Sequence, residues 1–373
     1  MNSIKIDNFI KIRSILDIEG IGIIKLLRLI EVFGSIDNLF NSDNVKLRLT
    51  EILNSDLTNK VTNTIHNFDS IKVKYKREIE NLIKLNVEVI TYWDENYPQQ
   101  LKNIFYPPII LYVLGNLSEK DEQSISIVGT RRNTDYGKSI TNYFSSELAK
   151  QNITIVSGMA RGIDSVAHKA AIKANGRTIA IIGSGLDNIY PPENKTLFEN
   201  IIENGVVISE FPLGTKPDAQ NFPKRNRIIA GFSLGTLVVE TRENGGAMQT
   251  AKFAFDQNKD VFAIPGNITS EQSKGTNILI QRNGAKLVFE PNDILLELEL
   301  KLNPIIAKTI HKPTIDLSLF EQKTYSVLED LPKQIDKIAI DSKLSISDTL
   351  VNLLTLEFKG LIQQLPGKQF KKI

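Results

Sequence analysis

The chain has 373 residues, of which 41% are hydrophobic and 24% are charged, a composition typical of a globular protein with more than one core. The formal net charge is only +2, which excludes an evenly basic surface, so any site for a polyanion must be a local patch. The absence of cysteine excludes disulfides, thiol nucleophiles and cysteine-bound metals, and three isolated histidines argue against a histidine metal site or a Ser-His-Asp triad.

No apolar run approaches the roughly 18 residues that a membrane-spanning helix needs. The N-terminal segment is interrupted by charged residues and lacks a cleavage site, so it does not resemble a signal peptide. We therefore expect a cytoplasmic protein without a membrane partner.

Residues 1–85 carry apolar residues at helical spacing, which predicts a small helical domain. The pattern breaks at Gly20-Ile21-Gly22, where a second helix is expected to begin and to run to about Phe33-Gly34. A glycine turn between two short helices resembles a helix-hairpin-helix motif, whose turn amides can hold a DNA phosphate. A purely structural helical hairpin is the favoured interpretation.

Residues 86–300 are predicted to form the central α/β domain. Residues 86–117 indicate a pair of lead-in strands, and from residue 123 onward short β-branched runs recur roughly every 25–30 residues with helical segments between them. This alternation predicts a doubly wound parallel sheet covered by helices on both faces. Right-handed crossovers place the carboxyl ends of such strands along one edge, where ligands bind.

Residues 301–315 read as a proline-containing linker, and residues 316–373 as a separate unit of three helices followed by a hairpin. That order is typical of a winged-helix domain, which binds DNA or protein. The expected third helix carries few basic side chains, so recognition of duplex DNA is the less favoured role.

The loop after the first core strand predicts an anion site. Gly129 permits a tight turn, Arg131 and Arg132 follow at once, and Tyr136-Gly137 begins the next helix. Helix amides beside a guanidinium are a common arrangement for binding anions. An arginine held in a salt bridge at the sheet edge is the alternative.

The loop after the second strand contains Gly158 and Arg161 before a helix that includes Asp164 and His168. His168 lies four residues after Asp164, but no nucleophile accompanies it, so a packed helix histidine is favoured over a general base. After the third strand, Gly183-Ser184-Gly185 is a weak dinucleotide motif without the expected acidic partner, which disfavours NAD. Lys195, further on, is expected either to reach the same edge or to be solvated.

The most informative segment follows the fourth strand, where an aromatic residue and a cluster of cations open a helix. Its members are Phe222, Lys224, Arg225, Asn226 and Arg227. Phosphates are expected on the cations and helix amides while a base stacks on the ring. A solvated basic turn with its phenylalanine in the core is the alternative.

The loop after the fifth strand offers another set of amides at Gly245-Gly246, with Gln249 and Thr250 expected to serve packing or capping. No acid/base pair, metal cluster or nucleophile with its base emerges along the chain. We therefore predict a binding protein with no cofactor, not an enzyme.

Taken in order, these segments resemble the DNA-processing protein A (DprA/Smf) family over about residues 90–290. The resemblance is carried by the following blocks: Val128-Gly129-Thr130-Arg131, Ser157-Gly158-Met159-Ala160-Arg161-Gly162-Ile163-Asp164, Tyr190-Pro191, Ser209-Glu210, Phe222-Pro223-Lys224-Arg225-Asn226-Arg227, Pro265-Gly266 and Gly275-Thr276-Asn277. The flanks fit as well, because a helical N-terminal domain, of helix-hairpin-helix or SAM-like type, and a C-terminal winged helix are common in the family.

The resemblance implies an extended Rossmann-like fold that binds single-stranded DNA, forms a homodimer, and protects and hands incoming strands to RecA during natural transformation. It places the DNA-contacting arginine of the family on Arg131 and brings Lys195 near. The full set of residues expected to bind DNA is Gly129, Arg131, Arg132, Gly158, Arg161, Lys195, Phe222, Lys224, Arg225, Asn226 and Arg227.

One alternative function from another class is a nucleotide-cleaving N-glycosidase of the related Rossmann-like superfamily. Its glycine-rich turn is only echoed by residues 245–250, which lack the glycine before Thr250 and the following glutamate.

Overall fold

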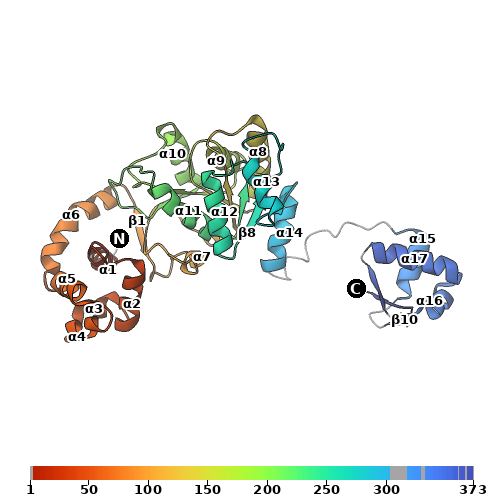
Figure 1. Ribbon diagram of the computed structural model, residues 1–373, viewed down its shortest axis with the longest axis horizontal. Helices are drawn as coiled ribbons and strands as arrows, with labels where there is room; N and C mark the ends of the chain where they lie inside the picture. The colour runs from red at the N-terminus through yellow and green to blue at the C-terminus, as the bar shows by residue number, and fades with distance from the viewer. Residues whose placement is uncertain (1–2, 303–316, 329–331, 360, 366–367, 373) are drawn as a thin grey trace. The chain divides into compact units, whose positions relative to one another are not determined.

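The computed structural model describes residues 3–302, 317–328, 332–359, 361–365 and 368–372. The chain forms two compact units, Met1–Leu298 and Glu299–Ile373. Figure 1 traces the chain from the N-terminal helices through the central sheet to the C-terminal helices.

The first unit begins with a group of helices. They are α1 (Ser3–Leu16), α2 (Ile23–Phe33), α3 (Ile36–Asn41), α4 (Val45–Thr50), α5 (Ser55–His66) and α6 (Phe68–Lys84). The helical hairpin expected around Gly20 is present: this glycine has φ +93°, and Gly34 ends α2 with φ +81°. Leu26, Leu29 and Phe33 are buried on one face of α2, as their spacing predicts.

The centre of the unit is a nine-stranded sheet in the order β1-β2-β6-β5-β4-β3-β7-β8-β9. Its strands are β1 (Glu88–Thr91), β2 (Ile110–Gly115), β3 (Ser124–Val128), β4 (Thr154–Ser157), β5 (Thr178–Ile182), β6 (Gly205–Ser209), β7 (Gly235–Val238), β8 (Asp260–Ala263) and β9 (Lys286–Leu287). Strands β3 to β9 are parallel, as predicted, whereas the lead-in strands β1 and β2 are antiparallel and make the complete sheet mixed.

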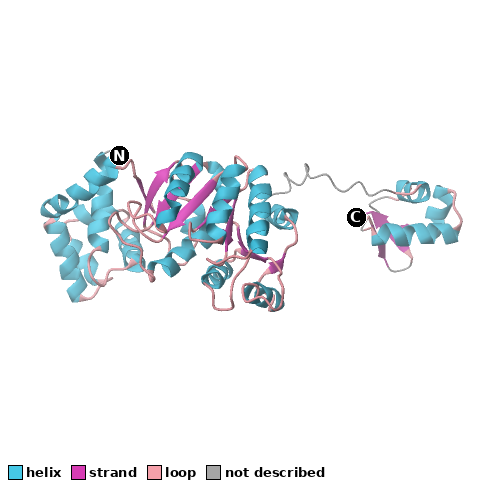
Figure 2. Ribbon diagram, turned by 90° about the horizontal axis from the view of Figure 1, so that it is seen from above, coloured by secondary structure: helices cyan, strands magenta, loops and turns pink. Residues whose placement is uncertain are grey.

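Helices cover the sheet, which lies between them in Figure 2. They are α7 (Gln99–Lys102), α8 (Asp135–Lys150), α9 (Ile163–Lys173), α10 (Lys195–Asn204), α11 (Asn221–Phe232), α12 (Gly246–Asp256), α13 (Lys274–Gln281) and α14 (Pro291–Leu302), with the 3₁₀ turns η1 (Glu119–Glu122) and η2 (Pro192–Asn194). Successive residues of β5 enter opposite cores: Ala180 packs with α10, and Ile179 packs with α11 and α12. Burial of both faces explains why the strands read as continuous apolar runs.

The direction of the chain across the sheet reverses beside β3. From β3 the chain proceeds through β4 and β5 to β6, then crosses back to place β7 on the other side of β3. The loops that leave β3 and β7 therefore diverge and leave a crevice between them at the carboxyl edge. Such a topological switch point is where open α/β sheets bind ligands.

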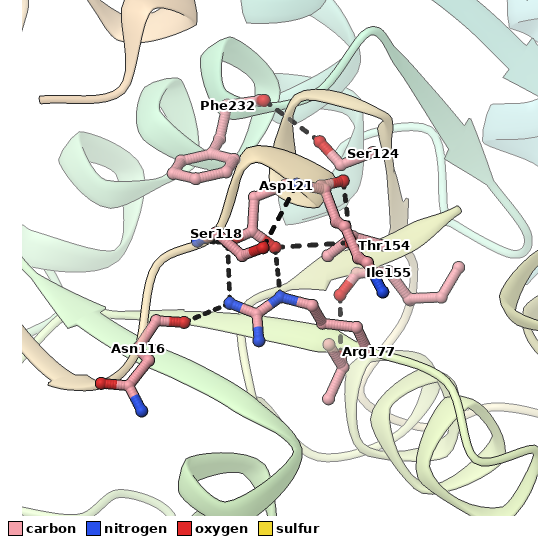
Figure 3. A network of polar contacts seen from close by, with 10 residues as sticks. Asn116, Ser118, Asp121, Ser124, Thr154, Ile155, Arg177 and Phe232 are labelled. Carbon is pink, nitrogen blue, oxygen red and sulfur yellow. Dashed lines mark hydrogen bonds and ion pairs between the residues drawn. The ribbon is translucent and has the colours of Figure 1, made fainter. Parts of the chain in front are cut away.

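The opposite, amino-terminal edge of the sheet is held together by an ion pair (Figure 3). Arg177 donates from Nε and Nη2 to the two carboxylate oxygens of Asp121 at 2.6 and 2.8 Å, and also donates to the backbone carbonyl of Asn116. Asp121 also accepts from the backbone N–H of Ser118 at 2.8 Å and the hydroxyl of Thr154 at 3.4 Å. One carboxylate thus joins the beginnings of three strands.

The second unit is a winged helix, as the sequence predicts. It consists of α15 (Leu319–Ser326), β10 (Lys333–Gln334), α16 (Ile335–Ser342), α17 (Ile346–Phe358), β11 (Ile362–Leu365) and β12 (Gln369–Lys372). The Ser345 hydroxyl accepts the N–H of Asp348 and caps α17. The predicted linker, residues 301–315, begins inside α14 and otherwise lies outside the described residues.

We expect Asp121→Ala to lower the free energy of unfolding by about 3 kcal/mol, because it leaves the Arg177 guanidinium without its buried partner. Glu122→Ala is the matched control, since Glu122 is an exposed neighbour in the same turn and should cost less than about 0.5 kcal/mol. Urea denaturation followed by circular dichroism measures both changes. Equal stability of the two variants would contradict the structural role of this ion pair.

Candidate nucleic-acid interface

A cavity of about 600 Å³, here called the switch-point cavity, opens at the carboxyl edge between β3 and β7. Its walls come from the loop after β3, the loop and first turn after β7, and the first turns of α9 and α11. Five of the residues selected from the sequence line it: Gly129, Arg131, Phe222, Arg225 and Asn226. Gly129 allows the turn after β3 to pack closely, since a Cβ there would lie 2.5 Å from the side chain of Ile163.

Glu240, just beyond β7, fixes the loop that carries Arg131. Its backbone carbonyl accepts the N–H of Thr130 at 2.7 Å, and its carboxylate accepts the hydroxyl and the N–H of Thr134 at 2.5 and 2.9 Å. Thr134 in turn caps α8 by accepting the N–H of Gly137. The exposed side chains of Arg131 and Arg132 therefore project from a loop tied down at both ends.

Four side chains form what we call the arginine–aromatic row: Arg131, Phe222, Tyr190 and Arg161. The Arg131 guanidinium carbon lies 5.1 Å from the centre of the Phe222 ring. The rings of Phe222 and Tyr190 are 5.8 Å apart, and the Arg161 guanidinium carbon lies 5.9 Å from Tyr190. These distances allow cation–π attraction, so a pair of aromatic rings is flanked by one guanidinium at each end of the row.

Arg161 has a partner of its own. Nε donates to Oε1 of Glu193, and Nη2 donates to Oε2 at 3.0 Å. The bidentate contact raises the pKa of Arg161 and lowers that of Glu193. Both side chains are about half exposed, at 51% and 52%, so water and salt screen the pair and an incoming phosphate can compete with Glu193.

Arg225 is not the surface cation that its position in the basic cluster suggested. It is 4% exposed, and Nη1 donates to the backbone carbonyls of Gly158, at 2.6 Å, and Ile181. Burial lowers the pKa of Arg225 to about 10, against the attraction of buried Asp164. The guanidinium fits here only because residue 158 is a glycine, since a Cβ at this position would lie 2.2 Å from Nη1. Arg225 therefore supports the site from below, and Gly158 makes room for it.

Arg227 also faces inward. Its Nη2 donates to the Glu210 carboxylate, and the two side chains are only 11% and 18% exposed. Burial raises the pKa of Glu210, and the Arg227 charge opposes that rise. The sequence predicts that Arg227 holds a phosphate. In the structure, its charge is instead neutralised by Glu210 beneath α11.

Two of the predicted lysines are exposed. Lys224 lies in the first turn of α11, and Lys195 begins α10. Within the described part of the chain, neither lysine side chain forms a hydrogen bond or an ion pair. Lys195 does not line the switch-point cavity, and its helix is anchored by Asn194, which donates to the carbonyl of Met159 at 2.8 Å.

His168 is packed, as the favoured interpretation held. It is fully buried, and its Nδ1 lies 2.6 Å from the Thr178 hydroxyl. Burial, followed by the nearby Arg225 charge, lowers the pKa of His168 to about 3, so the ring stays neutral. Asp164, on the cavity floor, has its pKa raised by burial. The Thr178 hydroxyl that His168 contacts is itself fully buried, so this contact is part of the packing and is closed to a substrate.

The structure adds two residues that sequence reasoning did not select. Tyr190 extends the row begun by Phe222, and Arg242 lines the switch-point cavity from the loop after β7. The pairing of β7 with β3 brings Arg242 to the same cavity as Arg131, and only the strand order reveals this. Tyr190 was visible in its motif, but nothing in the sequence showed that it would meet Phe222.

Across the described ranges, no group of three or more histidine, aspartate or glutamate side chains is arranged to hold a metal ion. None of the described helices is both long enough and apolar enough to cross a membrane.

Comparison with known proteins identifies relatives of both units. Residues 88–299 match the family model of DNA recombination-mediator protein A, and residues 312–368 match the DprA winged helix domain. The chain is 34% identical to Protein Smf of Synechocystis over 95% of this chain and 96% of that protein. It is 41% identical to DNA processing protein DprA of Bacillus subtilis over 57% of this chain and 71% of that protein.

Solved structures agree with these matches. DprA of Streptococcus pneumoniae superposes with a TM-score of 0.67 at 30% identity, covering 79% of this chain and 98% of that chain. DprA of Helicobacter pylori, whose structure describes a single-stranded DNA binding mode, gives a TM-score of 0.52 at 31% identity over 57% and 97% of the two chains. With the central domain, the winged helix and nearly its full length matched, the chain belongs to the DprA/Smf family of DNA recombination mediators.

Proposed function

We propose that this protein binds single-stranded DNA along the carboxyl edge of its sheet and acts without catalysing a reaction. The observation that carries the proposal is the arginine–aromatic row, in which exposed guanidinium groups flank the neighbouring rings of Phe222 and Tyr190. Arg131 heads this row and, among the described residues, has neither a hydrogen bond nor an ion pair to its side chain. It is therefore available to a phosphate.

An unpaired strand suits this surface better than a duplex. Arg131, Arg132 and Lys224 are exposed for the phosphates, while an aromatic face accepts a base only when that base is free of its neighbours. In a duplex the base faces are already stacked. Such binding tolerates any sequence, because every base presents an aromatic face.

Three features of the wider function are proposed from the behaviour of the family. We infer that the protein forms a homodimer, protects the bound strand, and transfers it to RecA during natural transformation in the cytoplasm. Exposed apolar side chains support self-association: Ile268 and Phe289, on the segments after β8 and β9, are 83% and 76% exposed. They lie at the open edge of the sheet, away from β1.

Nucleotide cleavage is not favoured by the geometry. An N-glycosidase needs a carboxylate free to act on the sugar, and Glu240 has both oxygens occupied by Thr134. Asp164 and His168 are the residues that most resemble a catalytic acid/base pair. His168, however, is fully buried and has no contact with solvent. Release of free base from a nucleoside monophosphate would reinstate the enzymatic alternative.

The double variant Arg131→Gln/Lys224→Gln is expected to lower affinity for single-stranded DNA at least about tenfold at moderate salt. It should also reduce the slope of log K against log salt by about 1.4, since each phosphate contact on a single strand contributes about 0.7. Fluorescence anisotropy with an oligothymidylate measures both quantities. Arg225 stays unchanged in this variant because its removal would disturb the fold.

Lys150→Gln serves as the control. Lys150 is exposed at the far end of α8, so this substitution removes one positive charge without changing the carboxyl edge of the sheet. If the double variant binds as tightly as the unmodified protein, the strand binds elsewhere.

The unmodified protein and the double variant also test transfer. The unmodified protein should speed RecA filament formation on the strand, and the double variant should not.

Phe222→Leu should weaken binding by about 1–3 kcal/mol with little change in the salt slope, because it removes a stacking face but no charge. Phe255→Leu, at a 65% exposed position on α12, is the matched control and should bind normally. If Phe222→Leu changes the salt slope and leaves the affinity at low salt unchanged, Phe222 does not contact a base as proposed.

Phe289→Asp is expected to convert the dimer to a monomer, because it places a charge at an exposed apolar position on the edge proposed for self-association. Light scattering after size-exclusion chromatography should show twice the chain mass for the unmodified protein and the chain mass for the variant. Phe320→Asp, on the winged helix and 57% exposed, should leave the mass unchanged. A dimer that survives Phe289→Asp would place the interface on another surface.

A further inference from the structure

The switch-point cavity has an open helix end on one wall. α12 begins at Gly246 after Gly245, and no side chain caps it. Within the described residues, the backbone N–H groups of Gly246 and Ala247 donate to no acceptor. Arg242, exposed on the same loop, has no hydrogen bond or ion pair to its side chain there. Two free amides, a helix dipole and a guanidinium therefore face the same space.

Buried polar side chains in the cavity provide an independent indication of a ligand. Thr250 lies one turn after Gly246 on the same face of α12, lines the cavity, and is only 2% exposed. Its hydroxyl has no hydrogen-bond partner among the described residues. Arg225, 4% exposed, also lines the cavity and leaves Nη2 without an acceptor there, although Nη1 is fully engaged. Buried polar groups without partners are uncommon in folded proteins.

The remaining lining fits the other parts of a nucleotide. Pro217, Pro223 and Ile229 supply apolar surface, while Asn226 and the Asp164 carboxyl supply hydrogen-bonding groups on the floor. A volume of about 600 Å³ is in the range of pockets that enclose small organic ligands. The position between β3 and β7 is the one at which open α/β sheets hold nucleotides by a helix N-terminus.

We propose that the switch-point cavity binds one terminally phosphorylated nucleotide, with the phosphate on the Gly246 and Ala247 amides, Arg242 and Thr250. The unit comes either from the 5′-phosphorylated end of a bound strand or from a free nucleoside monophosphate. The inference rests on the proposed function for the first source, because the arginine–aromatic row would hold the rest of the strand. A dianionic end phosphate has more charge than an internal phosphodiester, so the cavity discriminates strand ends.

Gly246 allows a precise change of one donor. A Cβ at this position meets nothing within 4 Å, and Gly245 has the extended backbone, ψ 155°, that suits a residue before proline. Proline is accepted at the first position of a helix. Gly246→Pro therefore removes one N–H from the phosphate site while the helix is retained, and Gly246→Ala is the matched control that keeps the N–H. Thr250→Val removes the hydroxyl with little change in shape.

The experiment compares the binding of oligothymidylates of one length with a 5′-phosphate, with a 5′-hydroxyl, or closed into a circle. The full chain should bind the 5′-phosphorylated strand about tenfold more tightly than the other two, as expected for charge-assisted hydrogen bonds. Gly246→Ala should keep this ratio, and Gly246→Pro and Thr250→Val should reduce it to about one. Circular dichroism and thermal melting verify that each variant is folded.

Calorimetric titration with dTMP separates the two sources. Saturable binding of dTMP that Gly246→Pro abolishes identifies a site for free nucleotides, and an end preference without dTMP binding identifies a site for strand ends. The inference is overturned if the three oligonucleotides bind equally and dTMP does not bind. Failure of the proposed function is distinct, because none of the oligonucleotides would then bind, whereas the dTMP titration would still test the cavity.

Discussion

The carboxyl edge of the sheet depends on one buried guanidinium. Arg225 donates to the carbonyls of Gly158 and Ile181, which lie at the ends of β4 and β5, and so joins α11 to two strands. Removing a charged group from water costs several kcal/mol unless its hydrogen bonds are replaced, and the nearby Asp164 carboxyl offsets part of that cost. The exposed parts of the site, Phe222 and Lys224, belong to the same helix and take their positions from this anchor.

The amino-terminal and carboxyl edges of the sheet differ in how many of their polar groups have partners. At the amino-terminal edge, Asp121 and Arg177 satisfy one another and close the fold. At the carboxyl edge, Arg131, Arg242 and the first amides of α12 are left without partners in the described structure. The Arg177 guanidinium is thus paired with a carboxylate, whereas several donors at the second edge are free among the described residues, so the Asp121–Arg177 pair contributes to stability and not to ligand binding. Substitutions at the two edges should therefore act independently.

Much of the architecture follows from the sequence. The parallel core was predictable because strands buried on both faces leave continuous β-branched runs, and the winged helix was predictable from its caps and glycine turn. The motifs also indicated which loops carry the site. The sequence did not distinguish the roles within the basic cluster: Lys224, Arg225 and Arg227 look alike in the chain, yet helical geometry exposes the first and turns the other two inward. The approach of Arg242 to Arg131 depends on strand order, which local patterns do not encode.

If a strand binds as proposed, the half-exposed contact between Arg161 and Glu193 affects the ion balance of that binding. When a phosphate binds a solvated lysine, cations are released only from the nucleic acid. A phosphate that reaches Arg161 first frees a carboxylate of the protein, which then attracts a cation from solution. That uptake cancels part of the release, so the number of ions counted by thermodynamic titration is smaller than the number of backbone contacts the strand makes.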